Sequence, residues 1–224
     1  MIAFIDIETT GLDTDSVDIL EIGVTLTTYH FEKIAEEVWV RYMPEYQLPK
    51  MDKWCQSQHV RSGLWEECRQ SKVQSYELID AAIVSFIERN GGAKGLMLGG
   101  RSVHFDRAII RRCLPQLDNF LHYRHLDISS VEWFLSLADR SLSQRSTRST
   151  HRALDDNDEA IQTAIRLKGY LNMEKNAVVT KEPEAKTKTA GDAKVTVCPV
   201  CSKIADTSGN TPKCPLHGSA PWEK

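Results

Sequence analysis

The sequence has no long hydrophobic run. None of its apolar stretches approaches the ~20 residues that a membrane-spanning helix needs, although 41% of the 224 residues are hydrophobic. The chain opens directly on an apolar, β-branched stretch, which leaves no room for the charged and apolar regions of a signal peptide. We therefore expect a soluble, cytoplasmic protein with one well-cored domain and a small appendage.

The sequence also lacks a strong excess of charge of one sign. Its 28 Lys and Arg residues against 31 Asp and Glu residues give a formal net charge of −3, and the isoelectric point is about 6.2. A broad electrostatic grip on long nucleic acid is not indicated, because such a grip needs an extended basic surface. Any nucleic-acid substrate would have to be held locally.

Cysteine is sparse over most of the chain. Three of the six cysteines are scattered and are expected to be reduced thiols, namely Cys55, Cys68 and Cys113. The others form two short motifs near the C-terminus, separated by twelve residues. Three thiolates and one imidazole can complete a tetrahedral Zn²⁺ shell with no open position, which is typical of a structural site. The four predicted zinc ligands are Cys198, Cys201, Cys214 and His217; the alternative is free cysteines in a disordered tail.

Two carboxylates interrupt the first apolar stretch. Residues 2–7 are apolar and β-branched enough for a buried strand. Side chains two apart on a strand share a face, so Asp6 and Glu8 would lie side by side while Ile5 and Ile7 pack opposite. Buried carboxylates need compensation, and Mg²⁺ or Mn²⁺ accepts such oxygens. The alternative is a strand that ends in a polar loop, with both acids solvated.

The apolar periodicity predicts an α/β fold. Strands are expected at residues 2–7, 19–29, 32–42, 95–99 and 123–128. Helices are expected at residues 51–70, 75–90, 104–113, 131–138 and 153–171. Short connections between the first three strands indicate an antiparallel meander. The order of elements predicts a mixed five-stranded sheet flanked by helices.

The composition changes twice along the chain. Residues 139–150 are rich in Ser, Thr and Arg and lack apolar periodicity, so we expect a mobile loop. Residues 175–194 mix Lys, Glu, Thr and Ala with few large apolar residues, which is a linker composition. We therefore predict a domain at 1–172, a linker at 173–195 and a zinc-binding segment at 196–224, built as a small knuckle or ribbon.

Later in the chain, two more stretches can supply ligands to the site of the Asp-x-Glu pair. Asp106 is expected at the start of a helix that follows a buried strand, and His151 and Asp156 at the entry to the last long helix. Asp-x-Glu, a later Asp and then His-x4-Asp resembles the DEDDh 3′–5′ exonucleases, whose fold is ribonuclease H-like. The spacing selects Asp156 over Asp155 as the fourth carboxylate.

The resemblance implies two Mg²⁺ or Mn²⁺ ions per active site, which would stabilise the attacking and leaving oxygens at phosphorus. The implied metal ligands are Asp6, Glu8, Asp106 and Asp156. The implied proton acceptor for the attacking water is His151, because an imidazole titrates near neutral pH. Taken singly, each residue has an alternative: Asp106 and Asp156 suit helix N-termini through the helix dipole, and His151 could be a surface histidine.

Two further stretches are similar to the oligoribonuclease branch of these exonucleases. Residues 51–64 contain Met-Asp-Lys-Trp, a histidine and Ser-Gly-Leu, similar to that branch's helix beside the base-binding pocket. Residues 122–129, His-Tyr-Arg-His-Leu-Asp-Ile-Ser, are similar to its dimer-contact segment. The likeness covers roughly residues 1–171. It implies a homodimer that cuts short single-stranded RNA, especially dinucleotides, to nucleoside 5′-monophosphates.

The same resemblance implies a set of substrate contacts. Leu12 and Trp54 would wedge and stack on the two bases of a dinucleotide. Tyr123 would reach into the site of the partner subunit, while Arg124 and Ser129 would help to cap the 5′-terminal phosphate. The complete set of implied substrate-binding residues is Leu12, Trp54, His59, Ser102, Tyr123, Arg124 and Ser129.

Departures from the family pattern keep alternatives open. Arg101 occupies a place where the family usually has Asn, and the 139–150 loop is short and Arg-rich. The arginines that either hold additional phosphates or are simply solvated are Arg140, Arg145, Arg148 and Arg152. Trp54 could be an interface or core aromatic, and Tyr123 a packing residue. The rival functions are a DNA exonuclease of the proofreading or repair type and a noncatalytic nucleic-acid-binding protein.

Overall fold

The computed structural model describes residues 1–142, 150–180, 189–190 and 193–194. The chain divides into two compact units, Met1–Gly169 and Tyr170–Lys224. Several predictions fall outside the described residues and stay predictions, namely most of the 139–150 loop with Arg145 and Arg148, and the zinc ligands Cys198, Cys201, Cys214 and His217. In the second unit, β6 (Thr189–Ala190) and β7 (Ala193–Lys194) pair antiparallel.

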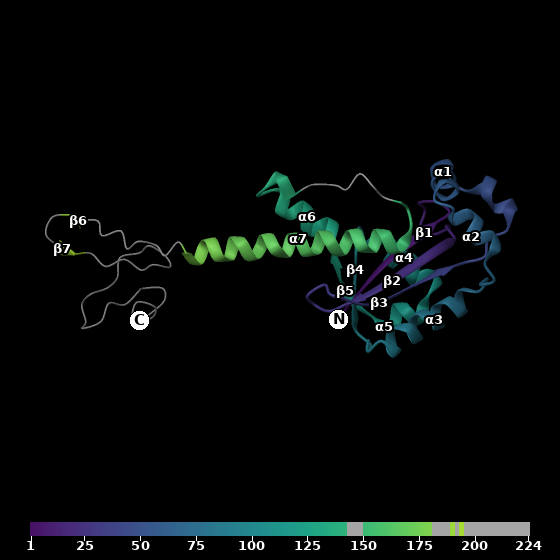
Figure 1. Cartoon of the computed structure of the whole chain (residues 1–224), viewed down its shortest axis with the longest axis horizontal. Helices are drawn as coiled ribbons and strands as arrows, with labels where there is room; N and C mark the ends of the chain where they lie inside the picture. The colour runs from purple at the N-terminus through teal and green to yellow at the C-terminus, as the bar shows by residue number, and fades with distance from the viewer. Residues whose placement is uncertain (143–149, 181–188, 191–192, 195–224) are drawn as a thin grey trace. The chain divides into compact units, whose positions relative to one another are not determined.

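The first unit is built on the predicted mixed sheet of five strands (Figure 1). The strands are β1 (Ile2–Thr9), β2 (Ile19–Thr27), β3 (Lys33–Val40), β4 (Leu96–Gly100) and β5 (Leu121–Asp127), in the spatial order β3-β2-β1-β4-β5. The first three form the expected antiparallel meander. The pairs β1/β4 and β4/β5 are parallel. The site-bearing strand β1 is therefore central, with a neighbour on each side.

Helices fill the connections between the strands. They are η1 (Glu45–Lys50), α1 (Lys53–Arg61), α2 (Leu64–Gln70), α3 (Tyr76–Arg89), α4 (His104–Cys113), α5 (Pro115–Phe120), α6 (Ile128–Ser136), η2 (Arg140–Leu142) and α7 (Ala153–Thr180). No helix within the described ranges combines the length and the apolar composition that crossing a membrane requires.

Three expectations about the helices were wrong. The single helix predicted over 51–70 is two helices, because Gly63 adopts a left-handed φ of 80° between them. The six-residue α5 was not predicted, since it is too short to show periodicity; it starts at Pro115, and the Asp80 carboxylate accepts N–H bonds of 2.8 Å from its first turn. Helix α7 continues beyond the predicted end at residue 171.

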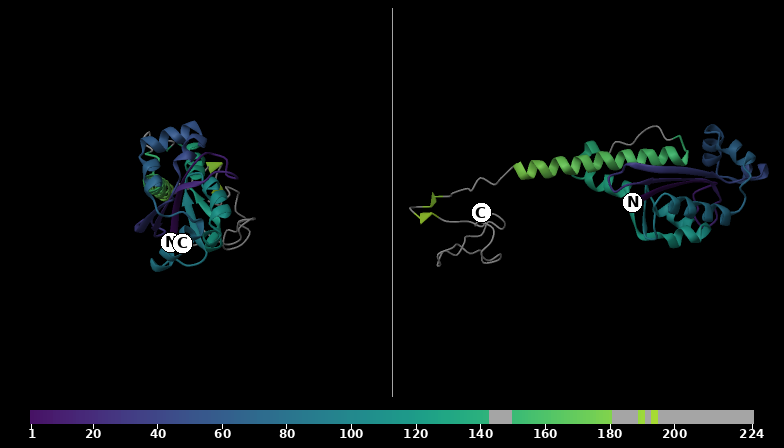
Figure 2. Two further views of the ribbon diagram at one scale, coloured as in Figure 1. Left: turned by 90° about the vertical axis from the view of Figure 1, so that its right-hand side faces the viewer. Right: turned by 60° about the horizontal axis from the view of Figure 1, so that its bottom comes forward.

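The two faces of the sheet have different chemistry. Ile5 and Ile7 are buried on one face and pack in a core that includes Ile83 of α3 and Ile109 of α4. Figure 1 shows α3 and α5 on one side of the sheet and α7 running across the other, and the same layers are seen in Figure 2. Because neighbouring residues alternate between faces, the acidic side chains of β1 point toward the α7 side.

Helix α7 approaches the sheet closely at β2. A Cβ atom on Gly23 would lie 2.9 Å from the Ala153 Cβ atom, so only glycine permits this contact without a shift. The Asn157 side-chain amide donates a hydrogen bond of 3.0 Å to the Gly23 carbonyl oxygen. Gly23 is also the residue paired with Asp6 across the β1–β2 ladder. The first turn of α7 is therefore held beside the acidic face of β1.

Gly23→Ala should lower the free energy of unfolding by about 1–3 kcal/mol, because the added methyl group overpacks the contact with Ala153. Gly169→Ala is the matched control: Gly169 is a helical glycine, and a methyl group added there would meet no neighbouring element within 4 Å. This control should change stability by less than about 1 kcal/mol, toward greater stability. Urea denaturation of both variants measures the difference, and equal effects would contradict the close approach.

Candidate active site

Strands β1 and β2 and helix α4 bring four acids close together. Asp6 and Glu8 lie on β1, and Glu21 on β2 is paired directly with Glu8. Asp106 comes from the first turn of α4, and its Oδ1 atom accepts a hydrogen bond of 3.1 Å from the Ile7 N–H. The sequence prediction that Asp106 begins a helix after a buried strand is confirmed.

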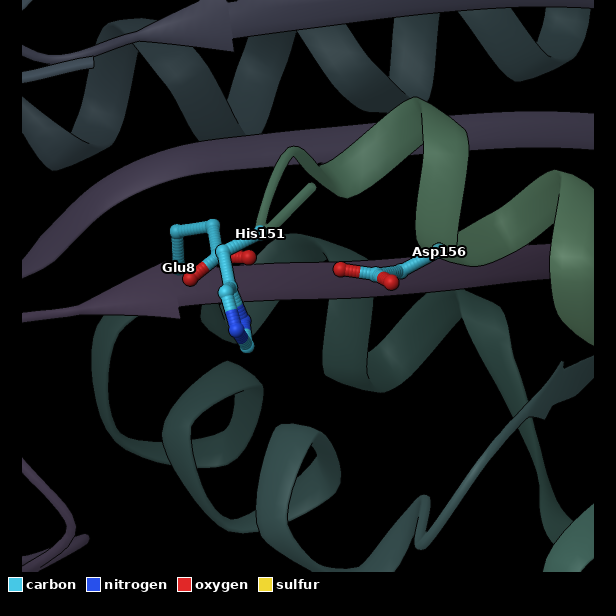
Figure 3. A group of neighbouring side chains, drawn as sticks. All are labelled: Glu8, His151 and Asp156. Atoms are coloured by element: carbon cyan, nitrogen blue, oxygen red, sulfur yellow. The ribbon is translucent and has the colours of Figure 1, made fainter. Parts of the chain in front are cut away.

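The entry to α7 adds a histidine and another carboxylate. Ligand atoms of Glu8, His151 and Asp156 all lie within 4.8 Å of one another. Figure 3 shows the Asp156 carboxylate directed toward Glu8 from the first turn of α7, with His151 beside Glu8. His151 precedes the helix and has a left-handed φ of 54°. The structure thus brings together residues separated by more than 140 positions in the sequence.

Burial and mutual repulsion disfavour the ionised forms of these acids. Burial raises the pKa of Asp6 well above its usual value, and the charges of Asp106 and Glu8 raise it further. Burial and the charge of Asp156 raise the pKa of Glu8 to about 8. Burial likewise raises the pKa of Asp106, although the Ile7 N–H bond opposes the rise. The cluster therefore favours any ligand that supplies positive charge.

Two other buried acids, Glu21 and Glu132, are paired with cations of the protein itself. Glu21 lies 2.8 Å from the Arg152 Nε atom, and Glu132 lies 3.1 Å from Arg101 and 2.8 Å from Arg166. Among the described residues, no Lys or Arg forms an ion pair with Asp6 or Asp106. Carboxylate oxygens of this kind, gathered close together, fit a hard divalent metal.

Trp54, which the resemblance assigns to base stacking, lies at this site. The Trp54 ring meets the His151 ring edge to face, with centroids 5.1 Å apart, and Trp54 remains 53% exposed. Leu12 is 71% exposed on the loop after β1. That loop is bonded to the start of α1, because the Asp52 N–H donates to the Thr10 carbonyl oxygen over 3.2 Å. Trp54 is therefore not a core residue, and about half of its surface is open to solvent.

His59 is buried against the acidic cluster. Its Nε2 atom lies 2.8 Å from the Thr9 carbonyl oxygen, which fixes the proton on that nitrogen because a carbonyl can only accept. Its Nδ1 atom lies 3.9 Å from the Glu8 Oε2 atom and has no hydrogen-bond partner in the described part of the chain. Burial lowers the pKa of His59. This nitrogen is thus a buried acceptor that faces the site.

Asp127 is a site residue that the sequence interpretation missed. Its Oδ1 atom accepts hydrogen bonds from the Ser102 N–H (3.1 Å) and the Ser129 N–H (2.9 Å). Ser102 has a left-handed φ of 51°, and the charge of Asp127 raises the pKa of Asp106 after the dominant effect of burial. The available signal was its position as the N-cap residue between β5 and α6.

The predicted phosphate-cap residues of β5 lie on the surface. Tyr123 is exposed and stacks on His122 with ring centroids 4.4 Å apart. The Arg124 guanidinium lies 5.2 Å from the Tyr123 ring centroid. None of the described contacts joins Tyr123 or Arg124 to the acidic cluster of the same chain. The structure therefore places these two residues against each other on the surface.

Two arginines use their guanidinium groups to bind acidic side chains of the protein itself. The suggestion that Arg152 holds an additional phosphate is wrong, because its guanidinium is bonded to Glu21 and Glu67. Arg101, which departs from the family pattern, donates hydrogen bonds to Glu132 (3.1 Å) and to the Thr163 hydroxyl (3.2 Å). Both arginines tie helix α7 or its entry to the rest of the domain.

The metal-free protein should lose stability as the pH rises from about 5 to about 8. The pKa of Glu8 is raised from 4.5 to about 8, so in this range the folded state binds more protons than the unfolded state, and the unfolding free energy falls with pH. Excess Mg²⁺ should reverse the loss near pH 8, because metal binds the deprotonated carboxylates. Urea denaturation with chelator and with Mg²⁺ measures both effects. Glu8→Gln should flatten the metal-free profile, and a flat wild-type profile would contradict the assignment.

Comparisons with known proteins agree with this geometry. Residues 3–164 match the exonuclease family. The oligoribonuclease of Acinetobacter baylyi is 35% identical over 163 residues, which cover 70% of this chain and 87% of the relative. The probable oligoribonuclease of Drosophila melanogaster is 32% identical over 176 residues, covering 76% of this chain and 82% of the relative.

Solved structures show the same fold at lower sequence identity. E. coli exonuclease I in complex with a dT13 oligonucleotide superposes with a TM-score of 0.56 and 18% identity, over 80% of this chain and 43% of that chain. This likeness concerns the ribonuclease H-like fold alone. With the family matched over nearly the whole first unit, and with relatives aligned over most of their length, the chain belongs to the exonuclease family and, within it, to the oligoribonucleases.

Proposed function

We propose that this 3′–5′ exoribonuclease acts on short single-stranded RNA, dinucleotides above all, and releases nucleoside 5′-monophosphates. The observation that carries the proposal is the close group of Glu8, His151 and Asp156 with the half-exposed Trp54 ring against His151. Acids and imidazole supply hydrolytic chemistry, and the exposed indole supplies a stacking surface for a base. One side chain thus links the reacting centre to base binding.

Exonucleases of this family require a divalent metal, and we propose two Mg²⁺ or Mn²⁺ ions per site. When bound, the ions would stabilise negative charge on the phosphoryl oxygens. The proposed ligands are Asp6, Glu8, Asp106 and Asp156. His151 would accept the proton of the attacking water, a role that suits histidine because imidazoles exchange protons near physiological pH. Its backbone has a left-handed φ of 54°, two residues before helix α7 begins.

Substrate length would be limited by the residues around the site. Trp54 and Leu12 expose apolar surface for the two bases of a dinucleotide, and the unpartnered Nδ1 atom of His59 can accept a hydrogen bond from a ribose hydroxyl. Ser102 and Ser129 are drawn together by Asp127. We assign Ser129 to a cap on the 5′ phosphate, together with Arg124.

The cap would be completed by a second subunit. Trp133 and Phe134 of α6 and the residue that caps its C-terminus, Leu137, are exposed, and residues three or four apart share one face of a helix. A contiguous exposed apolar patch on a soluble domain marks an interaction surface. Tyr123 of the neighbouring strand β5 is also exposed. We therefore propose a homodimer through α6 in which Tyr123 contributes to the site of the partner.

Cleavage of 5′-labelled RNA of two, four and seven nucleotides tests the function, beside matched DNA and with Mg²⁺, Mn²⁺ or chelator. The dinucleotide should be cut fastest, and chelator should abolish cleavage. His151→Ala should lower kcat by about 10²- to 10⁴-fold, because general base catalysis contributes that much, with metal binding by calorimetry retained. His30→Ala is the control for loss of an imidazole, because the His30 Nδ1 atom lies 2.9 Å from the Lys168 Nζ atom and outside the acidic cluster.

Equal or faster cleavage of long DNA would contradict the proposed substrate and favour a DNA exonuclease, for which the only support is the fold shared with exonuclease I. Metal-independent binding of RNA without any cleavage would favour a noncatalytic role. Either outcome would leave the geometry of the acidic cluster unchanged.

Phe134→Asp should weaken dimerisation by about 2 kcal/mol or more, roughly 30-fold, because it places a charge in the centre of the α6 patch. Light scattering after size exclusion should show a monomer with reduced dinucleotide cleavage. Leu78→Asp is the control, since Leu78 is an equally exposed apolar residue on the distant helix α3. A wild-type monomer, or a Phe134→Asp dimer of unchanged affinity, would refute the interface.

A further inference from the structure

Arg152 bridges two acids from different parts of the fold. Its Nε atom donates to the Glu21 Oε2 atom over 2.8 Å. Its two terminal nitrogens donate to the two Glu67 carboxylate oxygens, both over 2.8 Å. A bidentate arginine–carboxylate pair fixes orientation as well as distance, because both groups are planar. The guanidinium is therefore held in one plane by three hydrogen bonds.

Both partners of Arg152 stand on rigid elements. Glu21 is 2% exposed in the centre of β2, paired with Glu8 of β1. Glu67 lies on α2, whose inner side packs Leu64 and Cys68 in a second buried core. Although the Glu67 side chain is 47% exposed, the helix that carries it cannot move without opening that core. Arg152 thus connects the sheet, α2 and the entry to α7.

The backbone of Arg152 connects the proposed proton acceptor to a proposed metal ligand. His151 precedes it in the chain, and Asp156 is hydrogen-bonded to it. The preceding residue, His151, has a φ of 54°, a left-handed conformation that a non-glycine residue keeps only when its surroundings impose it. The Arg152 carbonyl oxygen accepts the Asp156 N–H over 3.1 Å. Any movement of Arg152 would therefore move His151 and Asp156 together.

We propose that Arg152 is a positioning residue: through Glu21 and Glu67 it holds His151 against Trp54 and holds the first turn of α7 against the sheet. The inference rests on the proposed function, in which His151 accepts the proton. It assigns α2 a part in the reaction through Glu67, whose carboxylate accepts hydrogen bonds from Arg152.

Glu67→Ala tests the bridge without disturbing a buried residue. Its control is Glu66→Ala: Glu66 is the adjacent acid of the same helix and is paired 3.0 Å away with Arg69 instead. Glu67→Ala should lower kcat for the dinucleotide by about 10- to 100-fold, because displacing a reacting group by an ångström has that effect. KM and the melting temperature should stay as in Glu66→Ala. Glu67→Gln, which keeps one acceptor for Arg152, should be intermediate.

A second readout does not depend on cleavage. In protein labelled with 5-fluorotryptophan, the Trp54 signal, identified by its loss in Trp54→Phe, reports the His151 ring 5.1 Å away. Glu67→Ala should shift or broaden this signal, whereas Glu66→Ala should leave it unchanged. Identical Trp54 signals and identical kcat in the two variants would overturn the proposal.

The two hypotheses can fail separately. Full activity of His151→Ala would refute the proton-acceptor role, yet the Trp54 signal of Glu67→Ala would still decide whether Arg152 positions the histidine. A shifted signal in Glu67→Ala supports the positioning role in either case. A lower kcat in Glu67→Ala could also come from a lower stability of the fold. If its melting temperature fell below that of Glu66→Ala while the Trp54 signal stayed unchanged, Arg152 would have a structural role only and the inference would be overturned.

Discussion

The burial of several like charges around strand β1 is the constraint on which the rest of the domain depends. Asp6, Glu8 and Asp106 lie where desolvation and mutual repulsion both raise their pKa values. Such a cluster costs folding free energy and persists only if the surrounding structure holds it. The apolar face of β1, with Ile5 and Ile7 in the main core, supplies that hold. Strand β1 therefore packs in the core through the apolar side chains of one face and presents Asp6 and Glu8 on the other.

Helix α7 completes the site because its first turn can lie in close contact with strand β2. The missing side chain at Gly23 and the small side chain at Ala153 let the helix start against β2, and the Asn157 bond to the Gly23 carbonyl sets its rotation. With that rotation, the adjacent Asp156 carboxylate faces Glu8. Packing, and not helix propensity, thus determines where the fourth carboxylate lies.

Local pattern predicted the five strands and the antiparallel meander of the first three, because alternation is read from contiguous residues. The group of Glu8, His151 and Asp156 was indicated by the resemblance to the DEDDh exonucleases, whose motif is spread along the chain. The bridge from Arg152 to Glu67 could not be predicted, since it joins residues 85 positions apart and depends on how α2 packs. The break at Gly63 was visible in the sequence but was read as part of a helix. The cap by Asp127 was missed because its partner Ser102 belongs to a different loop.

His151 is contacted from two sides, and the two contacts have different origins. Arg152 restrains its backbone through acids of the protein itself, whereas the Trp54 ring that touches its imidazole is half exposed. A base stacked on the free part of that indole would restrict the ring further and, through it, the imidazole. Binding of the terminal base would then also orient the imidazole of His151, the proposed proton acceptor. A nucleotide fragment without that base would lose kcat as well as affinity, since binding energy remote from phosphorus is used to align the reacting group.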